Sequence, residues 1–230
     1  MEDKATKRNM IKKTVIVAGA GGLTGSFLLE KLSKDKSIEH IIVLSRKALK
    51  PNLPKVKEVI VDFERLDRLD FWPDAHALFC CIGTTIKKAG SQENFRKVDF
   101  EIPVKLATQC ARFNISFHLI SSIGANPDSG NFYLKTKGET EEAIKQLDLS
   151  SVNIYRPSML FGPRKESRMG ESIGKVFMYV THPFLLGPLK NYRGIHVATV
   201  AQAMINREKS GEKGFHILES EQIKQTAAGR

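Results

Sequence analysis

A glycine-rich turn near the start of the chain constrains the possible fold more than any other feature. The apolar run 14–18 leads into this turn, and residues 23–33 then place apolar side chains at helical spacing. Glycines permit a tight turn between a strand and a helix, and the N–H groups at the start of a helix attract an anion. An ordinary strand–helix loop also favours glycine, but a turn after the first strand favours a dinucleotide pyrophosphate. The predicted contacts are Gly19, Gly21, Gly22, Leu23, Thr24 and Gly25.

Short apolar runs alternate with amphipathic stretches over most of the chain. We expect strands at 14–18, 40–44, 59–61, 77–82, 117–120 and 152–155, and helices at 23–33, 100–112 and 132–147. Continuous apolar strands separated by helices indicate a parallel sheet that is covered on both faces. The predicted fold is therefore α/β, a Rossmann-type doubly wound parallel sheet.

The length of 230 residues accommodates one large domain, predicted at 14–230. Residues 1–13 form a basic N-terminal arm, which we interpret as a solvated terminus rather than a nucleic-acid-binding segment. The segment 162–194 is rich in glycine, proline and arginine and breaks the alternation of strands and helices. Because ligands bind beyond the carboxyl ends of the strands in such folds, we expect this segment to form a small cap embedded in the same domain.

The end of the second predicted strand carries a cofactor signal. An acidic residue there would bind the ribose 2′-hydroxyl of NAD, but this chain has Ser45-Arg46-Lys47, with Arg46 placed 21 residues after Gly25. A guanidinium at this point pairs with a 2′-phosphate, so Arg46 and Lys47 favour NADP(H) over NAD(H). The alternative is an ordinary surface arginine. Asp62, after the third strand, is predicted to contact adenine or to cap a helix.

The catalytic candidates follow the later strands. Ile82, Gly83 and Thr84 come directly after the fourth strand and are predicted to pass beside the cofactor ribose. Tyr133 and Lys137 have the i, i+4 spacing that places both on one side of a helix, where the ammonium favours the phenolate form of the tyrosine.

A serine pair precedes this tyrosine and lysine at the end of the fifth predicted strand. A hydroxyl there can donate a hydrogen bond to a substrate carbonyl oxygen. Of Ser121 and Ser122 we favour Ser122, which lies farther out along the strand. The alternative for Tyr133 and Lys137 is an ordinary amphipathic helix with a solvated lysine.

These motifs together resemble the short-chain dehydrogenase/reductase superfamily, especially its extended and atypical branches. The shared motifs are the glycines at 19, 22 and 25, the Ser122/Tyr133/Lys137 set, Tyr155-Arg156-Pro157 with Gly162-Pro163, and Ile195-His196-Val197. The resemblance implies that Tyr133 is the acid/base, that Ser122 anchors the carbonyl oxygen and that Lys137 holds the nicotinamide ribose. Asp99 departs from this pattern, because the branch usually has asparagine there.

A closer resemblance is to the Tat-interacting-protein branch, a group of small atypical short-chain dehydrogenase/reductases that bind NADPH. It covers most of the chain and is carried by Gly83-Thr84-Thr85, Arg96-Lys97-Val98-Asp99, Tyr133 to Glu139 and Glu166-Ser167-Arg168. This resemblance implies that Leu160 and Arg168 join the cofactor contacts.

We therefore expect an NADP(H)-dependent oxidoreductase that acts on a small carbonyl or alcohol substrate. The alternative is an NADPH-binding redox sensor that captures a protein partner and turns over little or no substrate. A net charge of +11 allows a third hypothesis, nucleic-acid binding, but no motif supports it. No histidine or cysteine spacing predicts a metal, and no apolar run predicts a membrane span. A polar first segment and three cysteines without paired spacing predict a cytoplasmic location.

Overall fold

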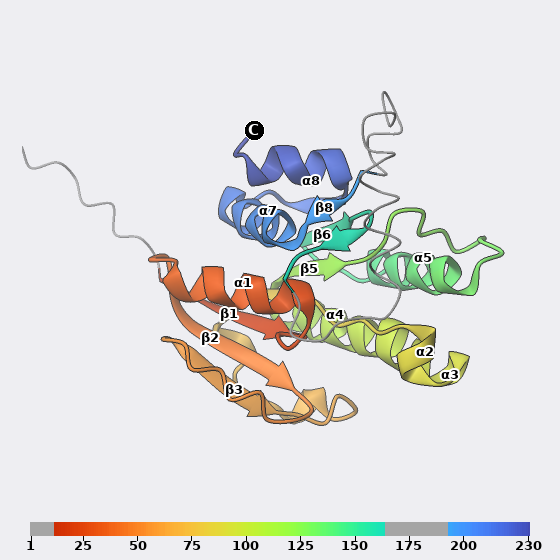
Figure 1. The fold of residues 1–230 in the computed structure, drawn as a ribbon. Helices are drawn as coiled ribbons and strands as arrows, with labels where there is room; N and C mark the ends of the chain where they lie inside the picture. The colour runs from red at the N-terminus through yellow and green to blue at the C-terminus, as the bar shows by residue number, and fades with distance from the viewer. Residues whose placement is uncertain (1–11, 164–192) are drawn as a thin grey trace, which may run out of the picture.

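The computed structural model describes residues 12–163 and 193–230, which build one parallel sheet with helices on both faces (Figure 1). The seven strands lie in the order β3-β2-β1-β4-β5-β6-β9, and every neighbouring pair is parallel. Their bounds are β1 (Lys13–Ala18), β2 (Ile38–Ser45), β3 (Val56–Ile60), β4 (Ala75–Cys80), β5 (Ser116–Ile120), β6 (Ser151–Arg156) and β9 (Gly214–Glu219). The order reverses between β1 and β4, the place where such sheets bind ligands.

The long helices form two layers. On one face lie α1 (Leu23–Lys34), α7 (Val197–Ser210) and α8 (Ser220–Ala227), and on the other lie α4 (Ile102–Phe113) and α5 (Phe132–Lys145) (Figure 1). Short helical turns precede α4, namely α2 (Ile86–Ala89), α3 (Gln92–Arg96) and the π-helical η3 (Lys97–Glu101). This architecture confirms the predicted Rossmann-type doubly wound α/β fold.

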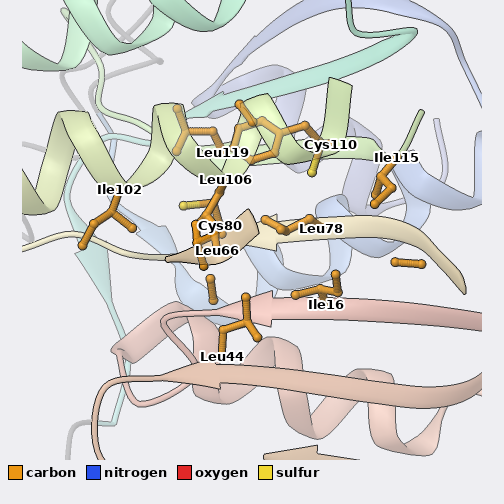
Figure 2. Close-up of a cluster of buried hydrophobic side chains, with 14 of the residues drawn as sticks. Ile16, Leu44, Leu66, Leu78, Cys80, Ile102, Leu106, Cys110, Ile115 and Leu119 are labelled. Atoms are coloured by element: carbon orange, nitrogen blue, oxygen red, sulfur yellow. The ribbon is translucent and has the colours of Figure 1, made fainter. Parts of the chain in front are cut away.

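The core under α4 holds the strand ends in place. Figure 2 shows that apolar side chains of the central strands meet those of α4, among them Ile16, Leu78 and Leu106, and these three are fully buried. Burial of such side chains contributes about 1.5–3 kcal/mol each. Cys80 also lies in this cluster, and burial raises the pKa of its thiol to about 12. The sheet edge that carries the candidate site therefore rests on a closely packed layer.

The six predicted strands are present, with changes at their ends. The strand expected at 77–82 is β4 (Ala75–Cys80). Cys81 lies beyond it, although its N–H still donates to the carbonyl of Ala18 at the end of β1. The strand expected at 59–61 is β3 (Val56–Ile60). The edge strand β9 was not predicted, although residues 215–218 have the same residue types as the run at 117–120. The short ribbon of β7 (Leu160–Phe161) and β8 (Ile195–His196) was not predicted either.

The structure describes little of the predicted N-terminal arm and of the predicted cap. Of the predicted arm only residues 12 and 13 are described, and of the predicted cap only 162, 163, 193 and 194. Across the described parts of the chain, no helix combines the length and the apolar character that crossing a membrane requires.

Candidate active site

The glycine turn after β1 is built as tightly as its sequence suggests. Gly19 has φ +87°, and a Cβ there would lie 2.6 Å from the carbonyl carbon of Cys81. A Cβ on Gly25 would overlap the carbonyl oxygen of Gly19. The Gly22 N–H donates to that same oxygen at 3.0 Å. Side chains at these positions would open the turn, so glycine is needed both for the backbone conformation and for close approach.

The start of α1 offers unpaired donors beside this turn. Gly22 is the N-cap, no side chain caps the helix, and its first turn contains no acidic residue. The first N–H groups of any helix lack an intrahelical acceptor. Those of Leu23, Thr24 and Gly25 therefore stand at the positive end of the helix dipole, as an anion-binding site requires.

The loop after β2 lies against the glycine turn. Arg46 and Lys47 are both exposed in it. A side-chain carbon of Leu49 lies 3.0 Å from where a Cβ on Gly21 would be. The structure therefore brings the basic loop and the predicted pyrophosphate turn together.

Asp62 is exposed and takes part in a local turn. Its Oδ1 accepts from the N–H of Glu64 at 3.0 Å, and its backbone carbonyl accepts from the N–H of Arg65. The nearest helical turn, η1 (Leu66–Arg68), has Arg65 as its N-cap, so the alternative that Asp62 caps a helix is wrong. Contact with adenine stays a prediction for this residue.

A buried ion pair joins η3 to α5 beside the loop that follows β4. Lys137 Nζ lies 2.8 Å from Asp99 Oδ1, and both side chains are at most 5% exposed. The other oxygen of Asp99 accepts from the N–H of Thr84 at 2.8 Å. Gly83 packs beside the pair, because a Cβ there would lie 3.9 Å from Lys137 Nζ. The predicted ribose loop and the predicted catalytic lysine are thus held together by Asp99.

The ion pair keeps Lys137 charged. Burial by itself would lower the pKa of Lys137, but the negative charge of the nearby Asp99 carboxylate outweighs it, and the pKa lies above its ordinary value. Lys137 is therefore an ammonium at neutral pH, and it lies one helical turn from Tyr133 on α5.

Tyr133 and the serine pair lie where β5 leads into α5. Tyr133 is half-buried in the first turn of α5, with its ring 5.7 Å from that of Phe95. The loop from Ser122 returns along this helix, because the Asn126 N–H donates to the carbonyl of Leu134. The two serines differ in their partners. The Ser121 hydroxyl donates to the buried Glu141 carboxylate, whereas the Ser122 hydroxyl donates to the backbone carbonyl of the adjacent Ile123 at 3.3 Å. Of the two serine hydroxyls, only that of Ser121 is bound to a buried side chain.

The last two predicted cofactor contacts have different outcomes. Leu160 lies in β7, two positions before Gly162, and a Cβ on Gly162 would be 3.8 Å from a side-chain carbon of Leu23 at the start of α1. The β7 segment therefore reaches the glycine turn. Arg168 lies outside the described residues.

Sequence reasoning missed the role of Asp99. The residue was noted only as a departure from the asparagine that the family usually has. Asp99 lies in η3, a π-helical turn, and such turns occur frequently at functional sites. No local pattern predicts the pair, because 38 positions separate Asp99 from Lys137. The local sequence also gives no signal, because Asp99 lies in a stretch that contains Lys97 and Glu101 as well.

These residues fit a dinucleotide. The glycine turn places backbone N–H groups at the uncapped start of α1, and Leu49 of the basic loop lies against Gly21. Thr84 follows the carboxyl end of β4, and Lys137 of α5 is held beside it through Asp99. The donor set combines helix-terminal N–H groups with cations, which is the chemistry that holds phosphates.

Comparison with known proteins agrees with this geometry. A model of the NAD dependent epimerase/dehydratase family matches residues 15–225. The enzyme WbmF of Bordetella bronchiseptica, solved in complex with NAD+, superposes with a TM-score of 0.66 at 18% identity, covering 95% of this chain and 77% of that one. At that identity the likeness concerns the fold.

Curated relatives align over nearly the whole chain. Protein HTATIP2 of Rattus norvegicus is 32% identical in an alignment of 224 residues that covers 93% of this chain and 89% of that protein. Protein FMP52, mitochondrial, of Candida albicans is 32% identical over 211 residues, covering 86% of this chain and 90% of the relative. The first of these agrees with the Tat-interacting-protein resemblance.

The cytoplasmic location predicted from the sequence is contradicted by this comparison. Several relatives, including those of Scheffersomyces stipitis and Candida albicans, are named mitochondrial. The prediction depended partly on three cysteines without paired spacing. That feature argues against a disulfide framework but does not choose between compartments inside a cell.

Proposed function

This chain belongs to the NAD dependent epimerase/dehydratase family, and we propose that within it the chain is an NADP(H)-dependent oxidoreductase interconverting a carbonyl and an alcohol. Membership makes it an NAD(P)-binding protein of the extended short-chain dehydrogenase/reductase type. The observation that carries the proposal is the buried Lys137 ammonium, one helical turn from Tyr133 and paired with Asp99 beside the loop after β4.

In this proposal the chain supplies proton transfer and orientation. A bound nicotinamide supplies or accepts the hydride at the substrate carbon. During reduction, Tyr133 gives its hydroxyl proton to the carbonyl oxygen, and the neighbouring Lys137 ammonium stabilises the phenolate that remains. Ser122 donates a hydrogen bond to the same oxygen, because its hydroxyl is free of the Glu141 contact that holds Ser121. Oxidation of an alcohol runs through the same steps in reverse.

The proposed reaction is tested by single-turnover oxidation of NADPH with a panel of aldehydes and ketones. A first-order loss of NADPH absorbance with at least one carbonyl, together with formation of the alcohol, is the expected result. Tight NADPH binding without turnover of any carbonyl would favour a redox sensor instead.

We infer the NADP(H) preference from the loop after β2. Ser45, rather than an acidic residue, ends the strand, and Arg46 and Lys47 follow it in exposed positions. A 2′-phosphate offers oxygens that accept charge-assisted hydrogen bonds from a guanidinium, whereas the 2′-hydroxyl of NADH does not.

Arg46→Asp is expected to weaken NADPH binding about 10- to 100-fold and to change NADH binding little, because only NADPH loses a charged contact. Both affinities are measured by fluorescence titration at one ionic strength. Lys36→Asp, the same change of charge at an exposed position after α1, is the control and should alter neither affinity. Equal losses for the two nucleotides would show that Arg46 does not contact the 2′-phosphate.

We further propose a mitochondrial location for this chain, by similarity to the FMP52 relatives that are named mitochondrial. A tagged full-length chain should sediment with mitochondria on fractionation and resist added protease until the membranes are dissolved. Recovery in the soluble fraction alone would contradict this assignment.

A further inference from the structure

A carboxylate on β3 holds the loop that carries Arg46 and Lys47. Glu58 Oε1 accepts from the N–H of Leu49 at 2.7 Å and from the Ser45 hydroxyl at 2.9 Å. Its other oxygen accepts from the N–H of Lys50 at 3.2 Å. One side chain therefore holds both ends of the loop 46–48, which contains the cations assigned to the 2′-phosphate.

The loop needs such an anchor. Lys50 has φ +49°, a left-handed conformation that residues other than glycine seldom adopt. The hydrogen bond from its N–H to Glu58 offsets part of that cost. The N–H of Leu49, more than any other neighbour, lowers the pKa of Glu58, so the carboxylate remains ionised at neutral pH.

The same contacts place the loop on the glycine turn. The Leu49 N–H is bound by Glu58, and the Leu49 side chain lies against Gly21. Leu49 is 43% exposed despite being apolar, so it is held over the turn rather than drawn into the core. A continuous set of contacts thus runs from β3 through the loop to the predicted pyrophosphate site.

We propose that Glu58 is a positioning residue for cofactor choice, which holds the loop 46–50 so that Arg46 faces the 2′-phosphate of NADP(H). The inference rests on the proposed function, because it assigns a cause to the nucleotide preference of that same site. A carboxylate near a phosphate would ordinarily repel it, but the oxygens of Glu58 already accept from three donors. Its carboxylate therefore fixes the backbone of the loop that carries the two cations.

The test measures NADPH and NADH affinities of Glu58→Ala and Glu58→Gln in the full chain. In Glu58→Ala the ratio of NADPH to NADH affinity should fall about tenfold, because the loop no longer presents Arg46. Glu58→Gln should lie between Glu58→Ala and wild type, since its amide oxygen still accepts one N–H. Glu39→Gln, at the far end of β2 and paired with Lys12, is the matched control and should leave the ratio unchanged.

Amide hydrogen exchange provides a readout without nucleotide. Leu49 and Lys50 should exchange faster in Glu58→Ala than in wild type, while β1 amides should not change. Unchanged exchange at these two amides, or equal losses of NADPH and NADH affinity, would overturn the inference. If wild type shows no NADPH preference and Arg46→Asp has no effect, the proposed cofactor assignment fails. Faster exchange would then support only the anchoring of the loop.

Discussion

Replacing Tyr133 with phenylalanine is expected to reduce carbonyl turnover by about 10²- to 10⁴-fold, because the variant removes the group that transfers the proton. The ring remains and can keep its contact with Phe95, 5.7 Å away, so the fold should be unaffected. Nucleotide affinity should also be unchanged, because the phosphate and ribose contacts come from other residues. The measurement is the single-turnover rate with saturating NADPH, accompanied by a fluorescence titration of the nucleotide.

Tyr155→Phe is the matched control for this change. Tyr155 is fully buried in β6, and its hydroxyl lies 3.0 Å from His118 Nδ1. Loss of that hydrogen bond should cost about 1 kcal/mol of stability and leave turnover intact. A Tyr133→Phe variant that retains the wild-type rate would remove the proton-transfer role, and a similar loss in both variants would indicate a general packing effect.

Asp99→Ala is expected to lower the free energy of unfolding by about 3–5 kcal/mol, because it leaves the Lys137 charge buried without its partner. The Thr84 N–H also loses its acceptor. Asp99→Asn should cost less, since an amide can still accept from Thr84. Urea denaturation at neutral pH measures both values.

Two further variants separate the ion pair from general packing. In a double-mutant cycle, Lys137→Met combined with Asp99→Ala should recover part of the loss, because neither charge is then left unpaired. Glu93→Ala breaks the exposed pair with Lys97 on the surface and should have no measurable effect. A loss for Asp99→Ala no larger than that of Glu93→Ala would contradict the assigned role.

The stability that the pair of Lys137 and Asp99 contributes should fall at high pH. The pKa of Lys137 is raised above its ordinary value of 10.5 in the folded protein. Its contribution to stability is therefore fully present at neutral pH and is lost only as the pH rises through the folded value. In Asp99→Asn the attraction that opposes burial is weakened, so the pKa of Lys137 falls and this loss begins at lower pH.

The order of elements and the glycine turn could be predicted because their signals are local. Residues 14–18 and 19–25 lie next to each other in the chain, and backbone sterics alone require glycine at Gly19, where φ is positive. The residues at which strands end were harder to predict from the sequence than the order of the strands and helices. Cys81 and Ile82 continue the apolar run beyond β4 but leave the sheet, because the loop packs against the glycine turn.

In the candidate site, too, local spacing could be predicted from the sequence and contacts between distant residues could not. Tyr133 and Lys137 could be paired from the sequence, because helical periodicity places them one turn apart on α5. The partners of the site residues could not be predicted from the sequence, because they come from separate elements. Asp99 lies in η3, Thr84 in the loop after β4 and Glu58 in β3.

Local patterns in the sequence were enough to predict a doubly wound sheet, a glycine turn at its first strand, a basic loop after its second strand, and a tyrosine and a lysine on one helix. The pairing of the charges depends on the folded arrangement of the chain. That arrangement paired Lys137 with Asp99, committed Ser121 to Glu141 and placed Glu58 under the loop of Arg46. The physical reason is that buried charges are stable only beside a partner, and parallel strands bring distant residues together at one edge of the sheet.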